Sequence, residues 1–170
     1  FRNSRIVGRR FQIVHVRFER EIIEVSTFRK QDPEVSENQS DSGMILRDNA
    51  FGSLEEDSLR RDFGVNAIYY NPLSKELIDL QGGIEDISRK LVRSIGPVDV
   101  RLREDPVRML RAIRISEKLG FELATDVRET IREMAHFIQD VSPARLFEES
   151  LKMFMGGYGV RIFLKLKELY

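Results

Sequence analysis

The first third of the chain alternates apolar and polar side chains, whereas the second half repeats them with a helical period. Residues 11–18 and 21–27 are rich in β-branched and aromatic side chains, and Glu19-Arg20 separates the two runs. This pattern predicts a β-hairpin. Because Glu-Arg is a poor two-residue turn, we expect the connection to be longer than these two residues.

A polar stretch follows the hairpin. Between residues 30 and 43 the only apolar side chains are Pro33 and Val35, which predicts a loop, and we expect order to return at Met44. Ser53 then precedes a run of three acidic residues within four positions. A serine cap with acids in the first turn predicts a short helix that ends at about residue 62.

A second pair of strands is predicted at residues 65–70 and 76–80. Asn71-Pro72 between them is typical of the start of a turn. Gly82-Gly83 comes directly after this pair and is too short to cradle a phosphate by itself, so we interpret it as a hinge or turn. The mixed part of the chain is expected to end there.

Helical periodicity dominates the second half. Pro106 and Pro143 stand where a helix tolerates proline, and Asp105 and Ser142 precede them as candidate caps. The pattern predicts four helices, at residues 106–119, 125–137, 143–155 and 160–169. The fold class is therefore α+β, with mixed and antiparallel strands first and helices afterwards.

The composition limits the kinds of site the chain can hold. Its 28 basic and 28 acidic residues balance, so any anion-binding surface must arise from local clusters. The chain has no cysteine, which excludes disulfides and thiolate metal sites, so a metal site needs carboxylates. No apolar stretch approaches the roughly 20 residues that span a bilayer, and no signal peptide is evident, so we expect no membrane partner and a cytoplasmic location. Phe1 is not an initiator methionine, and we expect the chain to be a fragment.

Glu24 is the first candidate for chemistry. Strand alternation places it on the face opposite Ile23 and Val25, together with Ile22 and Ser26. A carboxylate held on a rigid strand could bind a hard cation in a two-metal site. A solvated glutamate at the edge of a sheet is the alternative. Neither His15 nor His136 has a sequence neighbour that suggests catalysis, so we interpret both as structural.

Asp105 and Arg108 are the second candidates. They stand three residues apart and so share a helix face, where an acceptor beside a planar donor could read the edge of a nucleobase. Alternatively, Asp105 is an ordinary cap and Arg108 pairs with it. Arg111 and Arg114 continue the same stripe, which suits phosphates but is also typical of a solvated face.

A basic triplet forms the third candidate site. Arg60-Arg61-Asp62 could hold a ribose or a triphosphate, because the aspartate accepts hydrogen bonds and the arginines donate to phosphate oxygens. The same three residues could instead form an ion-pair cluster on the surface.

Together these motifs follow the order found in the family of bacterial poly(A) polymerases and CCA-adding enzymes, within the polymerase β-like nucleotidyltransferases, which the chain resembles. The resemblance covers nearly the whole chain. The matching segments are residues 21–29, 60–67, 104–112 and 142–149, with Asp79, Gly82-Gly83 and Asp86.

The resemblance implies an incomplete nucleotidyltransferase head at residues 1–93 and a helical neck, incomplete at its C-terminus, at residues 94–170. The head of this family holds two Mg²⁺ ions on three carboxylates, of which Glu24 matches the third. The other two come from an Asp-x-Asp motif after a Gly-Ser turn, and neither precedes Glu24 here. We therefore expect the isolated fragment to be inactive in nucleotidyl transfer.

The resemblance also implies roles for the remaining candidates. Residues of the triplet would contact the sugar and phosphates of ATP, whereas Asp105 and Arg108 would read its base. The expected nucleotide-binding set is Arg60, Arg61, Asp62, Asn66, Asp105, Arg108 and Arg111, and the expected RNA phosphate-binding set is Arg114 and Arg145. The family usually has threonine in place of Gly64, which changes the local backbone freedom.

Residues 7–16 and 144–148 resemble the poly(A) polymerase branch, which adds AMP from ATP to RNA 3′ ends. Addition of CCA to transfer RNA is the first alternative. A catalytically inactive, RNA-binding relative is the second, motivated by Gly64 and by the missing Asp-x-Asp. The expected partners are an RNA 3′ end and ATP, and the expected oligomeric state is a monomer.

Overall fold

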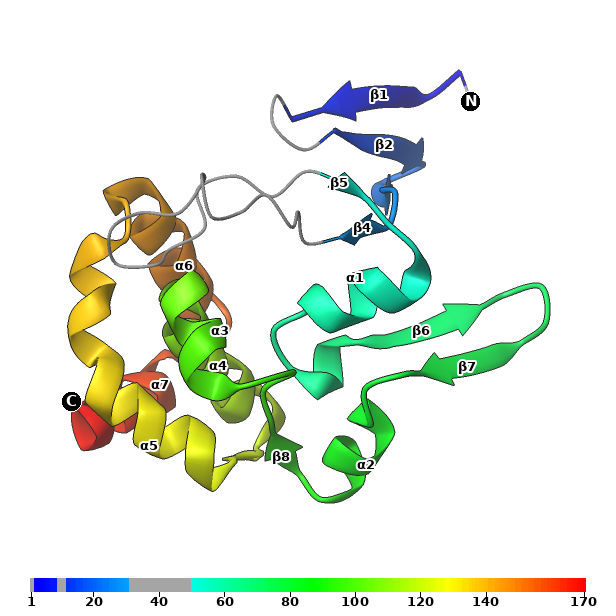
Figure 1. The fold of residues 1–170 in the computed structure, drawn as a ribbon. Helices are drawn as coiled ribbons and strands as arrows, with labels where there is room; N and C mark the ends of the chain where they lie inside the picture. The colour runs from blue at the N-terminus through cyan, green and yellow to red at the C-terminus, as the bar shows by residue number, and fades with distance from the viewer. Residues whose placement is uncertain (1, 9–11, 31–49) are drawn as a thin grey trace.

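The computed structural model describes residues 2–8, 12–30 and 50–170. Its N-terminal element is an antiparallel sheet with the order β1-β2-β3, made of β1 (Ser4–Val7), β2 (Ile13–Phe18) and β3 (Glu21–Val25) (Figure 1). The predicted hairpin is confirmed, but the expected longer connection is wrong. Phe18 pairs with Glu21, and Glu19 adopts a φ of 50°. A positive φ lets a two-residue turn close even without glycine.

The register assigns each side chain of this sheet to a face. Arg5, His15 and Glu24 are direct neighbours across the three strands and so share one face. The opposite face carries apolar side chains, including Ile6 and Val25, which are largely exposed. Residues 31–43 of the predicted loop, and Met44, lie outside the described residues.

The first helix begins as its cap predicts. β4 (Arg29–Lys30) pairs with β5 (Ala50–Phe51), and α1 (Leu54–Arg60) follows. The Ser53 hydroxyl accepts from the Glu56 N–H at 3.2 Å, and the Glu56 carboxylate accepts from the Ser53 N–H at 2.8 Å. This reciprocal pair satisfies two N–H groups at the start of α1.

The second strand pair is also confirmed. A 3₁₀ turn, η2 (Gly64–Asn66), leads into β6 (Ile68–Asn71), which pairs with β7 (Glu76–Asp79). The Asn71 side-chain oxygen accepts from the Leu73 N–H at 3.0 Å, so this residue does start the turn.

Three short elements after Gly82 were not predicted. They are α2 (Gly83–Ser88), β8 (Leu91–Val92) and α3 (Val98–Glu104). Asp79 caps α2, because its carboxylate accepts from the Gly83 N–H at 2.9 Å and from the Ile84 N–H at 2.8 Å. β8 pairs in parallel with β9 (Glu122–Leu123). The expectation that strands end near Gly82-Gly83 is therefore wrong.

The helical periodicity of the second half is confirmed. The helices are α4 (Val107–Leu119), α5 (Thr125–Met134), α6 (Pro143–Met155) and α7 (Gly159–Leu169), and the 3₁₀ segment η3 (Ala135–Asp140) follows α5. The Asp105 carboxylate accepts from the Val107 N–H at 3.3 Å, in agreement with a cap. Ser142 occupies the N-cap position of α6, as expected, but its side chain makes no capping hydrogen bond. Pro143 is the first residue of α6, where the missing N–H of proline would have no partner within the helix.

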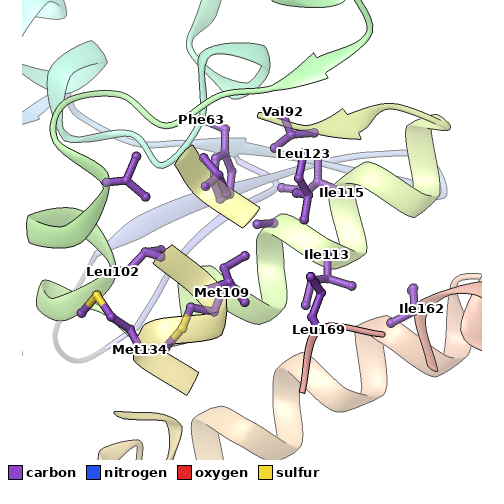
Figure 2. Close-up of a cluster of buried hydrophobic side chains, with 14 of the residues drawn as sticks. Phe63, Val92, Leu102, Met109, Ile113, Ile115, Leu123, Met134, Ile162 and Leu169 are labelled. Atoms are coloured by element: carbon purple, nitrogen blue, oxygen red, sulfur yellow. The ribbon is translucent and has the colours of Figure 1, made fainter. Parts of the chain in front are cut away.

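One hydrophobic core joins residues from both halves of the chain. Phe63 and Val92 pack with side chains of α3, α4, α5 and α7, and Figure 2 shows this cluster around Met109 and Ile113. Phe63, Met109 and Ile113 are almost completely buried. Because Phe63 directly follows the basic triplet, the core fixes where that triplet meets the helices.

Gly64 and Gly83 lie where η2 and α2 approach each other closely. A Cβ at Gly64 would overlap the Asp86 Oδ2 atom, and a Cβ at Gly83 would overlap the Gly64 carbonyl. Asp86 is held by Arg93, whose Nε donates to its Oδ1 at 2.9 Å. The close approach therefore leaves no room for a side chain at either glycine.

We expect Gly64→Ala to lower the free energy of unfolding by about 1–3 kcal/mol, because the new methyl group must displace the Asp86 carboxylate. Urea denaturation measures this change. Gly159→Ala is the matched control. A Cβ there meets only ordinary contacts, and alanine in a helix gains up to about 1 kcal/mol. Equal unfolding free energies for Gly64→Ala and the unmodified chain would contradict the steric argument.

Candidate functional site

A polar pocket of about 580 Å³ opens between the end of α1 and one face of α4. The structure brings together eight of the predicted site residues in its wall. They are Arg60, Arg61, Asp62, Asn66, Asp105, Arg108, Arg111 and Arg114. Arg145 reaches the wall through Asp105, whereas Glu24 does not line this pocket.

Asp62 is the buried anion of the pocket, with 8% of its surface exposed. Arg111 donates to its Oδ2 from Nε at 2.7 Å and from Nη2 at 2.5 Å. Its Oδ1 accepts from the Asn66 amide at 3.1 Å and from the Phe63 N–H at 2.9 Å. Burial opposes ionisation, but the Arg111 charge and these donors hold the pKa of Asp62 below its ordinary value. Asp62 is therefore a fixed carboxylate at neutral pH.

Arg60 and Arg61 share the carboxylate of Asp57, which is 1% exposed. The Arg60 Nε donates to Oδ1 at 3.0 Å, and the Arg61 Nη2 donates to Oδ2 at 2.7 Å. The Tyr69 hydroxyl donates to Oδ2 at 2.9 Å. Burial opposes ionisation of Asp57, yet Arg61 and Tyr69 lower its pKa. The triplet thus does form an ion-pair cluster, but that cluster lies in a pocket wall.

Arg101 joins α3 to the end of α1. Its Nη2 donates to the carbonyl oxygens of Arg60 at 2.6 Å and of Arg61 at 2.7 Å. Its Nη1 donates to the Glu104 carboxylate at 2.7 Å. Burial and the nearby Arg108 charge lower the pKa of Arg101, but an arginine remains charged in proteins. Arg101 therefore satisfies carbonyl groups that the end of α1 leaves unpaired.

Arg108 does not pair with Asp105, contrary to the simpler interpretation of their spacing. Its Nη1 donates to the Glu104 carboxylate at 3.1 Å and to the Arg101 carbonyl at 2.8 Å. Asp105 instead accepts from the Arg145 Nη2 at 2.8 Å and 3.0 Å. Each member of the predicted acceptor–donor pair is thus held by another partner, and both line the pocket.

The basic stripe on α4 is not a solvated face. The side chains of Arg108, Arg111 and Arg114 are 14%, 33% and 17% exposed. Arg114 donates from Nε to the Glu149 carboxylate at 2.5 Å, and Glu149 on α6 is buried. A guanidinium has five N–H donors, so each ion pair fixes the side chain and leaves donors for a ligand.

Glu24 lies on the N-terminal sheet and its side chain is 64% exposed. Its Oε1 is 3.3 Å from the Nε2 of His15, the neighbour across β2 and β3. A hard cation takes carboxylate oxygens, so Glu24 fits one ligand position of Mg²⁺. Among residues 2–8, 12–30 and 50–170, no three histidine or acidic side chains gather into a metal-binding group. No helix in the same part of the chain is long and apolar enough to cross a membrane.

Four residues that shape the pocket were missed from the sequence: Asp57, Arg101, Glu104 and Glu149. Asp57 stands three and four residues before Arg60 and Arg61, which is a helical ion-pair spacing that could have revealed it. Glu104 has the same relation to Arg108. Two contacts depend on tertiary packing, those of Arg101 with α1 and of Glu149 with Arg114. No local sequence pattern predicts them.

Two family models match the chain. The model described as "Poly A polymerase head domain" matches residues 1–93. The model described as "Probable RNA and SrmB-binding site of polymerase A" matches residues 120–169.

Known proteins and solved structures agree with these matches. Poly(A) polymerase I of Escherichia coli O6:H1 is 47% identical over the whole chain, and the CCA-adding enzyme of Geobacillus thermodenitrificans is 36% identical over 95% of it. The chain spans 38% and 39% of the lengths of these two relatives. The crystal structure of the Bacillus stearothermophilus CCA-adding enzyme in complex with CTP superposes with a TM-score of 0.72 and 35% identity. That match covers 92% of this chain and 36% of the other.

We expect Asp62 to make stability depend on pH. Because its pKa in the folded state is depressed, ionised Asp62 contributes fully to the free energy of unfolding above its ordinary pKa of 3.8. That contribution is lost as the pH falls through the lower pKa of the folded state. Asp62→Asn should cost about 3 kcal/mol at pH 7, since it leaves Arg111 without its carboxylate. Urea denaturation from neutral to strongly acidic pH should show this difference narrowing below about pH 4. A constant difference would contradict the assignment, and the exposed Asp140→Asn is the control.

Arg101→Met should lower the free energy of unfolding by about 3 kcal/mol, because it leaves two partly buried carbonyl groups without this donor. Arg103→Met is the control on the same helix. Arg103 is exposed and stacks over Phe137 at 5.2 Å, so its loss should cost under about 1 kcal/mol. Chemical denaturation measures both values, and equal losses would show that Arg101 does not join α3 to α1.

Proposed function

Because the chain belongs to the family defined by the poly(A) polymerase head domain, we propose that the whole protein is a template-independent nucleotidyltransferase that adds AMP from ATP to RNA 3′ ends. One observation carries this proposal. The pocket gathers the predicted sugar-, phosphate- and base-contacting side chains, although they are up to 54 residues apart, from Arg60 to Arg114. The 47% identity to Poly(A) polymerase I supports AMP addition in particular.

The proposed nucleotide site divides into two parts. Asp62 accepts a hydrogen bond from a ribose hydroxyl, and Arg60 and Arg61 offer guanidinium groups to the phosphates. Asn66 holds Asp62 in place, as does Arg111, which also lines the pocket and so contributes to nucleotide binding. This part recognises what all nucleoside triphosphates share.

The second part reads the base. Asp105 supplies an acceptor and Arg108 supplies donors. Adenine presents an amino donor beside a ring-nitrogen acceptor on its Watson–Crick edge, and cytosine presents the same order. Guanine and uracil present a carbonyl acceptor and an N–H donor, which oppose both side chains. The pair therefore supports selection of ATP or CTP against GTP and UTP.

Glu24 is the proposed link to bond formation. It can supply one carboxylate ligand to Mg²⁺, which when bound would neutralise phosphate charge and activate the attacking 3′-hydroxyl. Residues 1–93 form the proposed head and residues 94–170 the proposed neck. Arg114 and Arg145, beside the pocket, are proposed to contact RNA phosphates in the neck.

CCA addition to transfer RNA is the second candidate. The 36% identity to a CCA-adding enzyme and the superposition on the CTP-bound structure favour it. The base-reading pair supports both candidates equally, because adenine and cytosine present the same pattern. Only the product distinguishes them.

Primer extension by the whole protein, with each nucleoside triphosphate supplied separately, tests the proposal. We expect a long tract of A from ATP, and kcat/KM for ATP about 10- to 100-fold lower in Asp105→Ala, because one base contact is worth about 1–3 kcal/mol. Glu129→Ala, an exposed acid on α5, should leave the rate unchanged.

Two further outcomes are informative. CMP followed by a single AMP on transfer RNA, with no long tract, would assign the protein to CCA addition. The 170-residue chain alone should incorporate no AMP, since Glu24 is the one expected metal-binding carboxylate in it. Clear incorporation by this chain would show that no further carboxylates are needed.

A further inference from the structure

The face of the N-terminal sheet that carries Glu24 is basic. Arg5, His15 and Glu24 form one row across β1, β2 and β3, with His15 in the middle. Arg17 lies two residues from His15 on β2 and therefore points to the same face. Its neighbour across the pair is Ile22, so Glu24 is the only acid on this face of the three strands.

A second pocket, of about 310 Å³, lies over this basic face. Arg2, Arg5, His15 and Arg17 line it. Among residues 2–8, 12–30 and 50–170, no carboxylate lies within ion-pair distance of Arg5 or Arg17. Glu24 lies against His15 instead.

This charge pattern is the reverse of that in the polar pocket between α1 and α4, the α4 pocket. There Arg108, Arg111 and Arg114 each meet a carboxylate of the chain itself. Here, among the described residues, the guanidinium groups of Arg5 and Arg17 have no such acid, and both line the second pocket. Planar guanidinium groups with free donors match a phosphate group in charge and in geometry.

We propose that Arg5 and Arg17 bind a backbone phosphate of the RNA strand close to its 3′ end. The inference rests on the proposed function, because it takes Glu24 to mark the face where the bond forms. Adjacent strands are about 4.8 Å apart, so Arg5 stands about 10 Å from Glu24 across the sheet. An arginine side chain at that distance reaches a strand whose end lies beside Glu24.

The contents of the pocket between α1 and α4 favour RNA as the source of this phosphate. The nucleotide already has Arg60 and Arg61 for its phosphates, on another element of the fold. The RNA strand must still be held so that its 3′-hydroxyl lies at the reaction centre. In the proposal, the basic face of the sheet holds it there. The proposed RNA contacts of Arg114 and Arg145 lie in the helical half and so leave this position to the sheet.

Binding of a six-nucleotide oligoadenylate, labelled with fluorescein, tests the inference in the whole protein without Mg²⁺ or ATP. We expect Arg5→Ala and Arg17→Ala each to weaken binding about three- to tenfold, as measured by anisotropy. Each should also reduce the slope of log K against log salt by about 0.7, the value for one phosphate contact with a single strand. Arg17→Lys keeps the charge and should retain the slope.

Arg89→Ala is the control. Arg89 is an exposed arginine of α2 that pairs with Glu85, so its loss should change neither the affinity nor the slope. Circular dichroism and thermal unfolding establish that each variant is folded. Should an alanine variant fail to fold, Arg17→Gln gives the same comparison with a side chain of similar length. An unchanged salt slope in the folded Arg5 and Arg17 variants would overturn the inference.

Steady-state primer extension separates the two sources of phosphate. A raised KM for the oligoadenylate with an unchanged KM for ATP supports the RNA contact. A raised KM for ATP alone would overturn it and assign the basic face to the triphosphate. If the unmodified protein incorporates no AMP, the proposed function fails, yet the anisotropy measurement still decides whether Arg5 and Arg17 bind RNA.

Discussion

The geometry of the α4 pocket depends on one buried cation, Arg101. A guanidinium removed from water must be matched by acceptors, and Arg101 has two carbonyl groups at the end of α1 and the Glu104 carboxylate. Glu104 also holds Arg108. The end of the helix that bears Arg60 and Arg61, proposed to contact phosphates, and the Arg108 side chain, proposed to read the base, are therefore positioned by the same Arg101–Glu104 ion pair. A shift of α3 relative to α1 would move both parts of the proposed nucleotide site.

Arg111 and Arg114 in the pocket wall are also matched by acids, and in both pairs the acid and the base come from different elements. Asp62 after α1 meets Arg111 on α4, and Glu149 on α6 meets Arg114. Such pairs contribute little net stability, but they hold long side chains in one position. In the proposed function, paired arginines select the nucleotide. The arginines of the sheet face beside Glu24, which meet no acid in the described part of the chain, are proposed to bind a strand of nucleic acid.

Local signals explain which parts of the fold were predictable. The capping box at Ser53 and the apolar period of α4 act within one element, and the structure agrees with both. The sequence also identified eight of the residues that line the pocket, because its motifs match a family. The contacts of Arg101 with α1 span 40 and 41 residues and depend on how α3 packs. α2 and α3 have six and seven residues, too few for a helical period to stand out.

Gly64 is one of the two features that favour an inactive relative, and its surroundings weaken that argument. The space that a side chain would fill there is taken by the Asp86 carboxylate, which is oriented by Arg93, the residue directly after β8. Gly64 thus permits the close approach of η2 to α2. Asp62, two residues earlier, keeps its contacts with Arg111, Asn66 and the Phe63 N–H. Because Asp62 is held by these contacts two residues from Gly64, the glycine is compatible with an ordered wall of the proposed nucleotide site.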